Sequence, residues 1–230
     1  MTEPRPTALV LGASRAIGLA VVEQLVDRGW QVVGTVRGER RTELHDLADR
    51  EPRVEVETAD LTDRESLTAL RERLDGRPLD LLLVNGAITH GDVAGTDVTP
   101  ESFTEVMLMN ALGPMTALGV LADLVVPTGT VAVMSSSQGS VSLNTDGGYD
   151  VYRASKSALN QLLRSHVARH ADDPRTFLLL NPGHIQTDLG GPTAPLTIDE
   201  AVPAVVDTLV GVAGRGGLHF LDRFGQDVPW

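Results

Sequence analysis

The sequence contains no cysteine and only one lysine, Lys156, among its 19 basic residues. Without cysteine the chain forms neither a disulfide framework nor a thiolate site, a composition that fits a reducing compartment. Aromatic residues make up only 3% of the chain, so no stacking platform for a particular ligand is evident. Because every other basic residue is arginine, the single ammonium suggests a role that a guanidinium cannot fill.

Positive charge and long apolar runs are also scarce. The formal net charge of -12 argues against a nucleic-acid partner, since phosphate contacts need clustered basic residues. No apolar stretch approaches the roughly 20 residues that span a bilayer, so no membrane partner is expected. The N-terminus, residues 1–6, is short and polar, and we expect no signal peptide. These absences predict a soluble cytoplasmic protein.

Apolar runs alternate with amphipathic patterns along the whole chain, and 230 residues suit a single domain. The pattern predicts strands over residues 7–11, 31–36, 53–57, 80–84, 130–135, 176–181 and 217–221. It predicts helices over residues 16–28, 39–50, 63–74, 100–123, 149–171 and 199–212.

Strands that are almost entirely apolar, each followed by a helix, favour a parallel sheet covered on both faces. We therefore expect one α/β domain over residues 1–230, a Rossmann-type doubly wound parallel sheet of about seven strands. Ligands of such sheets bind beyond the carboxyl ends of the strands. The segment 187–200, rich in glycine and proline, is expected to form a lid over that site.

A glycine-rich turn, Gly12–Gly18, joins the first strand to the first helix. Such a turn lets backbone N–H groups approach a pyrophosphate at the N-terminus of the helix. The sequence therefore predicts a dinucleotide site whose contacts include Gly12, Ser14, Arg15, Ile17 and Gly18.

Arg37 follows the second strand, where an acidic residue would bind a ribose 2′-hydroxyl. A guanidinium there suits a 2′-phosphate instead, and Arg15 in the glycine turn favours the same cofactor, NADP(H). Arg40 and Arg41 fit the surface of the next helix better.

Three further strand ends carry polar or turn-forming residues. Asp60 and Leu61 follow the third strand, where Asp60 either accepts a hydrogen bond from an adenine amino group or caps the next helix. Asn85 and Gly86 form a turn that passes beneath the cofactor. After the sixth strand, a turn is expected to hold a nicotinamide carboxamide through Pro182, Gly183, Ile185 and Thr187.

Tyr152 and Lys156 lie four residues apart on one predicted helix, so both side chains share a face. A nearby ammonium favours phenolate and lowers the pKa of the tyrosine. The tuned phenol is then suited to exchange a proton with a carbonyl oxygen.

Two other features point toward the same place. The serines of the run 135–137 follow the fifth strand, where a hydroxyl would hold a substrate oxygen beside Tyr152. Asn110 interrupts the apolar face of a long helix, and a buried amide needs partners. We expect it to kink the helix and to hold a water connected to Lys156.

These motifs, together with Gly139 after the serines, resemble those of the short-chain dehydrogenase/reductase family over Thr7–Trp230. The C-terminal segment resembles a compact subgroup that includes carbonyl-reductase-like and C-factor-like proteins. The resemblance implies NADP(H)-dependent hydride transfer between nicotinamide and the carbonyl or alcohol carbon of a small molecule. It also implies a homodimer or homotetramer built through the two long helices.

The resemblance implies a role for each motif residue. Tyr152 would be the catalytic acid/base, and Lys156 would lower its pKa and bind the nicotinamide ribose. Ser136 would orient the substrate carbonyl, and Asn110 would hold the relay water. The 2′-phosphate would be bound by Arg15 and Arg37.

Three positions depart from the pattern of the family. Leu11 replaces a threonine, Ala16 replaces the middle glycine of the turn, and Gly86-Ala87 reverses the order of the family's alanine and glycine. The methyl group of Ala16 is expected to crowd the cofactor.

Other interpretations stay open at this stage. One is an NAD(H)-dependent alcohol dehydrogenase, and another is a cofactor-binding signalling or interaction protein without turnover. His166 and His170 have metal-ligand spacing, but a solvated helix end is favoured and no metal site is predicted. Tyr149 competes poorly with Tyr152 for the acid/base role, because its partner four residues on is Arg153.

Overall fold

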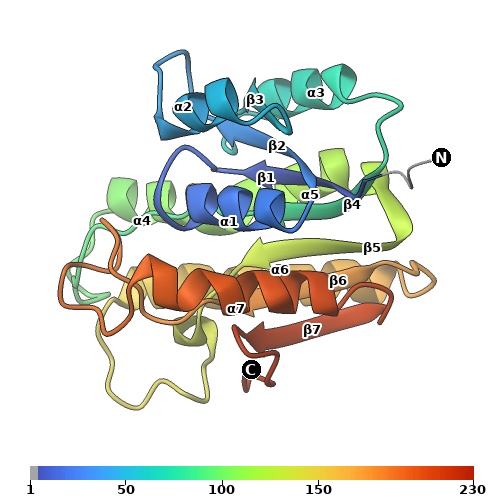
Figure 1. The fold of residues 1–230 in the computed structure, drawn as a ribbon. Coiled ribbons are helices and arrows are strands. Elements are labelled where there is room, and N and C mark those ends of the chain that lie inside the picture. Colours follow the sequence, from blue (N-terminus) through green and yellow to red (C-terminus); the bar gives the residue numbers. More distant parts are fainter. Residues whose placement is uncertain (1–4) are drawn as a thin grey trace.

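The computed structural model describes residues 5–230, in which seven strands form one parallel sheet of order β3-β2-β1-β4-β5-β6-β7 (Figure 1). The first four residues of the polar N-terminus lie outside this range. The strands are β1 (Thr7–Leu11), β2 (Gln31–Val36), β3 (Val54–Thr58), β4 (Leu79–Val84), β5 (Val125–Met134), β6 (Thr176–Asn181) and β7 (Gly217–Asp222). The predicted doubly wound fold is confirmed.

Helices cover both faces of the sheet, and α1 and α7 lie in front of it in Figure 1. One face packs against α1 (Ala16–Asp27), α2 (Glu43–Arg50) and α7 (Ile198–Gly211). The other packs against α3 (Arg64–Arg73), α5 (Gly113–Leu121) and α6 (Asp150–Arg169). Consecutive residues of β1 alternate between these two cores: Ala8 belongs to the first and Leu9 to the second. This explains why the strands are apolar throughout rather than at every second residue.

The predicted starts of two elements, α2 and β5, are wrong by several residues. Helix α2 begins at Glu43 rather than at residue 39, because Thr42 and His45 form a capping box that fixes the first turn. Strand β5 begins at Val125, five residues before its predicted start.

The segment Pro100–Leu124 is one continuous helical rod with a change of pitch. It comprises α4 (Pro100–Met107), the π-helical turn η1 (Leu108–Leu112), α5 and the 3₁₀ turn η2 (Ala122–Leu124). By length and composition alone it is apolar enough to cross a membrane, contrary to the expectation that no stretch of the chain is. Its most apolar stretch is 56% buried within the protein, and α5 packs into the core of the sheet, as a core helix does.

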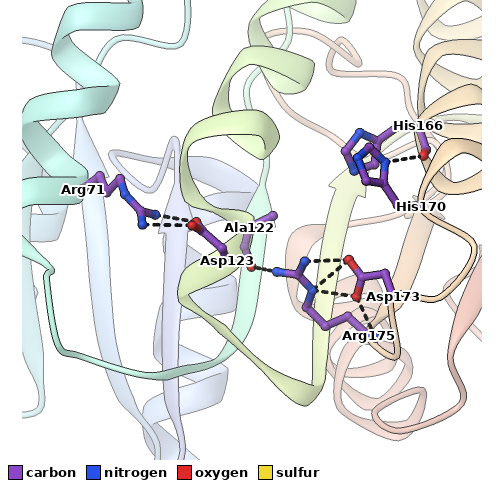
Figure 2. Close-up of polar contacts among 7 residues, drawn as sticks. All are labelled: Arg71, Ala122, Asp123, His166, His170, Asp173 and Arg175. Atoms are coloured by element: carbon purple, nitrogen blue, oxygen red, sulfur yellow. Dashed lines mark hydrogen bonds and ion pairs between the residues drawn. The ribbon is translucent and has the colours of Figure 1, made fainter.

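Two arginines bind the carboxyl end of this rod (Figure 2). Arg71 donates to the Val120 carbonyl at 2.9 Å and pairs with Asp123. Arg175 donates to the Ala122 carbonyl and also pairs with Asp173. Cationic donors suit the last carbonyls of a helix, because the helix dipole makes this end negative.

His166 and His170 lie at the C-terminal end of α6, whereas Tyr152 lies in its first turn. Figure 2 shows the two histidines side by side. Their rings stack at 4.3 Å, and His170 Nδ1 donates to the His166 carbonyl at 2.8 Å. Among residues 5–230, no three His, Cys, Asp or Glu side chains are grouped to hold a metal ion. His170 is the C-cap residue of α6, and its ring binds a carbonyl of the last turn.

Candidate active site

A cavity of about 600 Å³ opens at the carboxyl ends of the strands, where ligands of doubly wound sheets bind. Of the residues proposed from the sequence, all but Gly18 and Asn110 line it. These are Gly12, Ser14, Arg15, Ile17, Arg37, Asp60, Leu61, Asn85, Gly86, Ser136, Tyr152, Lys156, Pro182, Gly183, Ile185 and Thr187.

The glycine turn brings two stretches of backbone into contact. Gly12 has φ +80°, and a Cβ there would lie 3.3 Å from the Gly86 nitrogen. A Cβ on Gly18 would lie 2.1 Å from the Gly12 carbonyl oxygen, which no rearrangement of a side chain relieves. Gly18 therefore lies beneath the turn, and its predicted contact with the cofactor is replaced by a packing role.

Ala16 adopts φ +50°, a left-handed conformation that disfavours any residue with a Cβ. It does not line the cavity. The effect of the substitution that the structure shows is backbone strain, and crowding of a cofactor by the methyl group stays a prediction.

The other two departures from the family pattern have local explanations. A Cβ at Gly86 would lie 2.5 Å from Leu61 Cδ1, so glycine comes first in this turn because Leu61 packs against it. Leu11 is buried in the core. Although Leu11 brings no hydroxyl to the turn, the hydroxyl of Thr35 on β2 accepts a hydrogen bond of 3.1 Å from the Gly12 nitrogen.

Asp60 and Arg37 lie at neighbouring strand ends and both line the cavity. Burial favours a raised pKa for Asp60, but hydrogen bonds from Thr62 and the charge of Arg37 outweigh it and lower that pKa. The N-cap of α3 is Asp63, which accepts from the Glu65 nitrogen at 2.9 Å, so Asp60 is free of that role. Arg41 precedes α2 and pairs instead with Asp46 and Asp49 of that helix.

Arg15 in the glycine turn forms an ion pair with Asp188, which follows β6. Both side chains are exposed, and the pair joins the two sides of the cavity mouth. Asp188 belongs to the predicted lid, but α7 begins at Ile198, so the last three residues of the segment 187–200 are helical.

Helix α6 places Tyr152 and Lys156 in the same cavity. Lys156 is only 1% exposed, and its Nζ donates to the Met134 carbonyl at 2.9 Å. The Nζ atom lies 5.8 Å from the centre of the Tyr152 ring. The only lysine of the chain is therefore deeply buried beside the phenol.

Burial governs the protonation of both groups. It raises the pKa of Tyr152 to about 12, against a smaller lowering by the Ser136 hydroxyl, and it lowers the pKa of Lys156 to about 8. The prediction that Lys156 lowers the pKa of Tyr152 is therefore wrong for this structure. Desolvation of the phenol dominates, and the ammonium is bonded to a carbonyl of β5.

Ser135 and Ser136, in the serine run after β5, have different surroundings. Ser135 donates to Asn160 Oδ1 at 2.6 Å, whereas Ser136 lies at the start of the 3₁₀ turn η3 (Ser137–Gly139) and lines the cavity. A Cβ at Gly139 would lie 2.9 Å from Lys156 Cβ, so glycine lets η3 rest directly on α6. Asn160 is buried and was not among the predicted site residues. Its position four residues after Lys156, on the same helix face, could have indicated it.

Asn110 is fully buried within η1, behind the cavity wall. Its amide donates to the Ile88 carbonyl at 2.8 Å and to Ser155 Oγ at 3.0 Å, and it accepts from the Ile88 nitrogen at 2.8 Å. Where a kink was predicted, the helix continues through a π turn. Asn110 thus joins the loop after β4 to α6 beside Lys156.

Several lining residues had no signal in the sequence. They include Thr35, Ile88, Thr89, Met109, Met134 and Leu189. Most are apolar or belong to loops, so only the fold shows that they face the cavity.

Known proteins with the same pattern support this geometry. The family model for the short chain dehydrogenase matches residues 6–195. The C-signal protein of Myxococcus xanthus is 33% identical over 155 residues, which cover 66% of this chain and 93% of that protein. A 1-hydroxy-2-glutathionyl-2-methyl-3-butene dehydrogenase of Rhodococcus sp. is 29% identical over 97% of this chain and 99% of that protein.

Solved structures agree over almost the whole chain. A structure from Burkholderia multivorans with bound NADP has a TM-score of 0.97 and 47% identity, covering 99% of this chain and 100% of that one. A carbonyl reductase from Pseudomonas aeruginosa in complex with NADP has a TM-score of 0.91 and 33% identity, with the same coverage. From its sequence, its sheet and its site, the chain belongs to the short-chain dehydrogenase family of oxidoreductases.

Proposed function

We propose that the protein is an NADP(H)-dependent carbonyl reductase, with Tyr152 as its catalytic acid/base. One observation carries the proposal: the Tyr152 phenol, the only ammonium and the Ser136 hydroxyl share one cavity with the glycine turn. The cofactor would supply the hydride, and these side chains would handle the oxygen and its proton.

The residues present fit a dinucleotide with a 2′-phosphate. Gly12 and Gly86 line the cavity with backbone alone, and a Cβ on either would press against packed protein atoms. Arg37 and Arg15 supply cations at the adenosine end. The similar Burkholderia and Pseudomonas structures both contain NADP, which supports the same choice here. We assign Pro182–Thr187 to the nicotinamide end.

Tyr152 suits the reducing direction. With a pKa of about 12 it is a neutral phenol near pH 7, and so it holds the proton that a carbonyl oxygen needs when a hydride reaches its carbon. Ser136 would donate to the same oxygen and orient it. Lys156 would bind the ribose and place a positive charge beside the phenol when the tyrosine gives up its proton.

Asn110 would hold a relay water through its backbone. Residue 114 is proline, which has no N–H to donate to the Asn110 carbonyl. The Gly113 nitrogen bonds to the Leu108 carbonyl in the π turn. The Asn110 carbonyl therefore lacks its α-helical donor and is suited to accept from a water near Lys156.

The test is consumption of NADPH with a panel of aldehydes, ketones and quinones. We expect turnover with NADPH, and tighter binding of NADPH than of NADH. Tighter binding of NADH would contradict the role of Arg37 and favour an NAD(H)-dependent alcohol dehydrogenase.

A signalling function without turnover is the second candidate, favoured by the similarity to the C-signal protein. The variant Tyr152→Phe separates the two functions. Biological activity that survives this substitution, with NADPH binding intact, would favour signalling.

We also propose that the protein self-associates as a homodimer or homotetramer through its long helices, and works in the cytoplasm. Exposed apolar side chains on α4, η1 and α6 support that interface: Phe103, Leu108, Leu112 and Leu162. Light scattering on the purified protein gives the mass in solution, and a monomer at micromolar concentration would contradict it.

A further inference from the structure

The chain enters α6 through three consecutive left-handed residues. Gly147 has φ 70°, Gly148 has φ 78° and Tyr149 has φ 53°. Glycine adopts this conformation freely, but for tyrosine it costs roughly 1–2 kcal/mol. Within residues 5–230, Tyr149 and Ala16 are the non-glycine residues with positive φ.

Hydrogen bonds from three directions hold this strained entry. The Tyr149 nitrogen donates to Asp92 Oδ1 at 2.7 Å. Arg153 Nε donates to the Gly148 carbonyl at 2.7 Å. The loop containing Asp92 is itself tied to α6, because the Gly95 nitrogen donates to Asp150 Oδ2 at 2.9 Å. A conformation fixed this firmly at a site suggests that its side chain has a use.

The Tyr149 side chain lines the same cavity as Tyr152, three residues further along α6. It is 41% exposed, so the ring keeps a free surface. Ile88, Thr89 and Leu189 also line this cavity, and they offer apolar atoms to a ligand. The aromatic ring is thus available to pack against the body of a substrate whose oxygen lies at Tyr152.

The charges that line the cavity do not favour an anionic substrate. Arg15 and Arg37 lie in the glycine turn and after β2, the two segments assigned to the adenosine end. Lys156 is bonded to the Met134 carbonyl, and a ring nitrogen of His184 is bonded to the Gly190 carbonyl at 2.7 Å. Asp188, beside Leu189, is already paired with Arg15, so this ion pair offers no free cation to a carboxylate.

We infer that Tyr149 determines substrate specificity, and that the substrate is a neutral carbonyl compound with an apolar or aromatic body. Asp92 is a positioning residue, which acts by fixing the backbone of Tyr149. This inference rests on the proposed function, because it places the reacting oxygen at Tyr152.

The test uses substrates that differ in one property each. Methyl 4-acetylbenzoate and 4-acetylbenzoate carry the same ring and ketone and differ in charge, and propanal lacks the ring. We expect kcat/KM for the ester to exceed that for the acid by about tenfold or more, since a buried unpaired charge is costly. Equal kcat/KM for the ester and the acid would overturn the neutral class.

Variants of Tyr149 test the ring. Tyr149→Gly removes the ring and also suits the left-handed backbone, so the fold is retained. We expect the ratio of kcat/KM for the ester to that for propanal to fall about tenfold, mainly through a higher KM for the ester, and Tyr149→Phe to restore most of it. An equal change for both substrates in Tyr149→Gly would overturn the role in specificity.

Variants of Asp92 test its role separately. Asp92→Ala removes the acceptor for the Tyr149 nitrogen, whereas Asp92→Asn keeps an oxygen at that place. We expect Asp92→Ala to raise KM for the ester and Asp92→Asn to rescue it. If Asp92→Asn raises KM for the ester as much as Asp92→Ala does, Asp92 does not act through its hydrogen bond to the Tyr149 nitrogen.

Calorimetric binding of the ester to the NADPH-saturated protein distinguishes the two proposals. If the wild type turns over no carbonyl compound, the proposed function fails. Weaker binding of the ester to Tyr149→Gly than to the wild type would then still support the role of Tyr149. Absence of ester binding to the wild type would overturn it.

Discussion

The Asn110 amide donates a hydrogen bond of 3.0 Å to the Ser155 hydroxyl, and so joins the π turn to α6 one residue before Lys156. Asn110→Ala removes this bond and both bonds to Ile88. We expect the free energy of unfolding to fall by about 2–4 kcal/mol, because buried polar groups are left without partners. Urea unfolding measures it. Ser155→Ala, which removes the hydroxyl of one partner, should lower it less, and an equal loss would contradict the account.

Ala16→Gly should stabilise the protein. Alanine is disfavoured at φ +50° and glycine is not, so we expect a gain of about 1 kcal/mol and a rise in Tm of roughly 2–4 °C. Affinity for NADPH should be unchanged, because Ala16 does not line the cavity. Ala20→Gly is the matched control within α1, and should destabilise by about 1 kcal/mol. A lower Tm for Ala16→Gly than for the wild type would contradict backbone strain at Ala16.

Arg37→Ala should weaken the binding of NADPH by about 10–100-fold, the value of a charge-assisted hydrogen bond to phosphate, and leave the binding of NADH nearly unchanged. Fluorescence titration with each cofactor checks this. Arg40→Ala is the control, since Arg40 does not line the cavity. If both substitutions weaken NADPH binding equally, the effect is one of general charge.

Lys156→Met should stabilise the protein while abolishing catalysis. Burial lowers the pKa of Lys156 from 10.5 to about 8, so below pH 8 the folded state carries a poorly solvated ammonium. Removing it should raise the free energy of unfolding at pH 7 by roughly 1–3 kcal/mol, once the lost hydrogen bond to Met134 is included. Denaturant unfolding of both proteins measures the difference.

The same pair should show a specific dependence on pH. Between pH 8 and 10.5 the unfolded chain binds more protons at Lys156 than the folded chain, so the contribution of this group to stability rises with pH. The advantage of Lys156→Met should therefore shrink from pH 8 toward pH 10. The unfolding measurements end at pH 10, because the pKa of Tyr152 in the folded state is about 12. The contribution of Tyr152 to the free energy of unfolding is therefore lost between pH 10 and 12. A difference independent of pH would mean that Lys156 is well solvated.

The sequence was sufficient for the fold because its apolar runs and its helical periodicity agree along the whole chain. It also located Tyr152, Lys156 and Ser136, because residues after parallel strands, and on the helices beside them, meet at one edge of the sheet. These inferences need only the order of strands and helices along the chain, which the apolar runs and the helical periodicity predict.

Properties that depend on three-dimensional surroundings were not predictable. The pKa of Tyr152 rises because the phenol is buried. The four-residue spacing of Tyr152 and Lys156 predicts neither that burial nor the hydrogen bond from Lys156 to the Met134 carbonyl. The left-handed backbone of Tyr149 depends on a hydrogen bond to Asp92, 57 residues earlier in the chain. Such relationships follow from packing, so they appear only when the fold is known.

Turnover by Tyr152→Phe, measured together with its affinity for NADPH, tests the central claim most directly. The substitution removes the proton donor and leaves the ring and the glycine turn in place. We expect kcat with a reducible carbonyl substrate to fall by about 10²–10⁴-fold while the Kd for NADPH stays within about twofold. A variant that binds NADPH and retains wild-type kcat would contradict the assignment of Tyr152 as the acid/base.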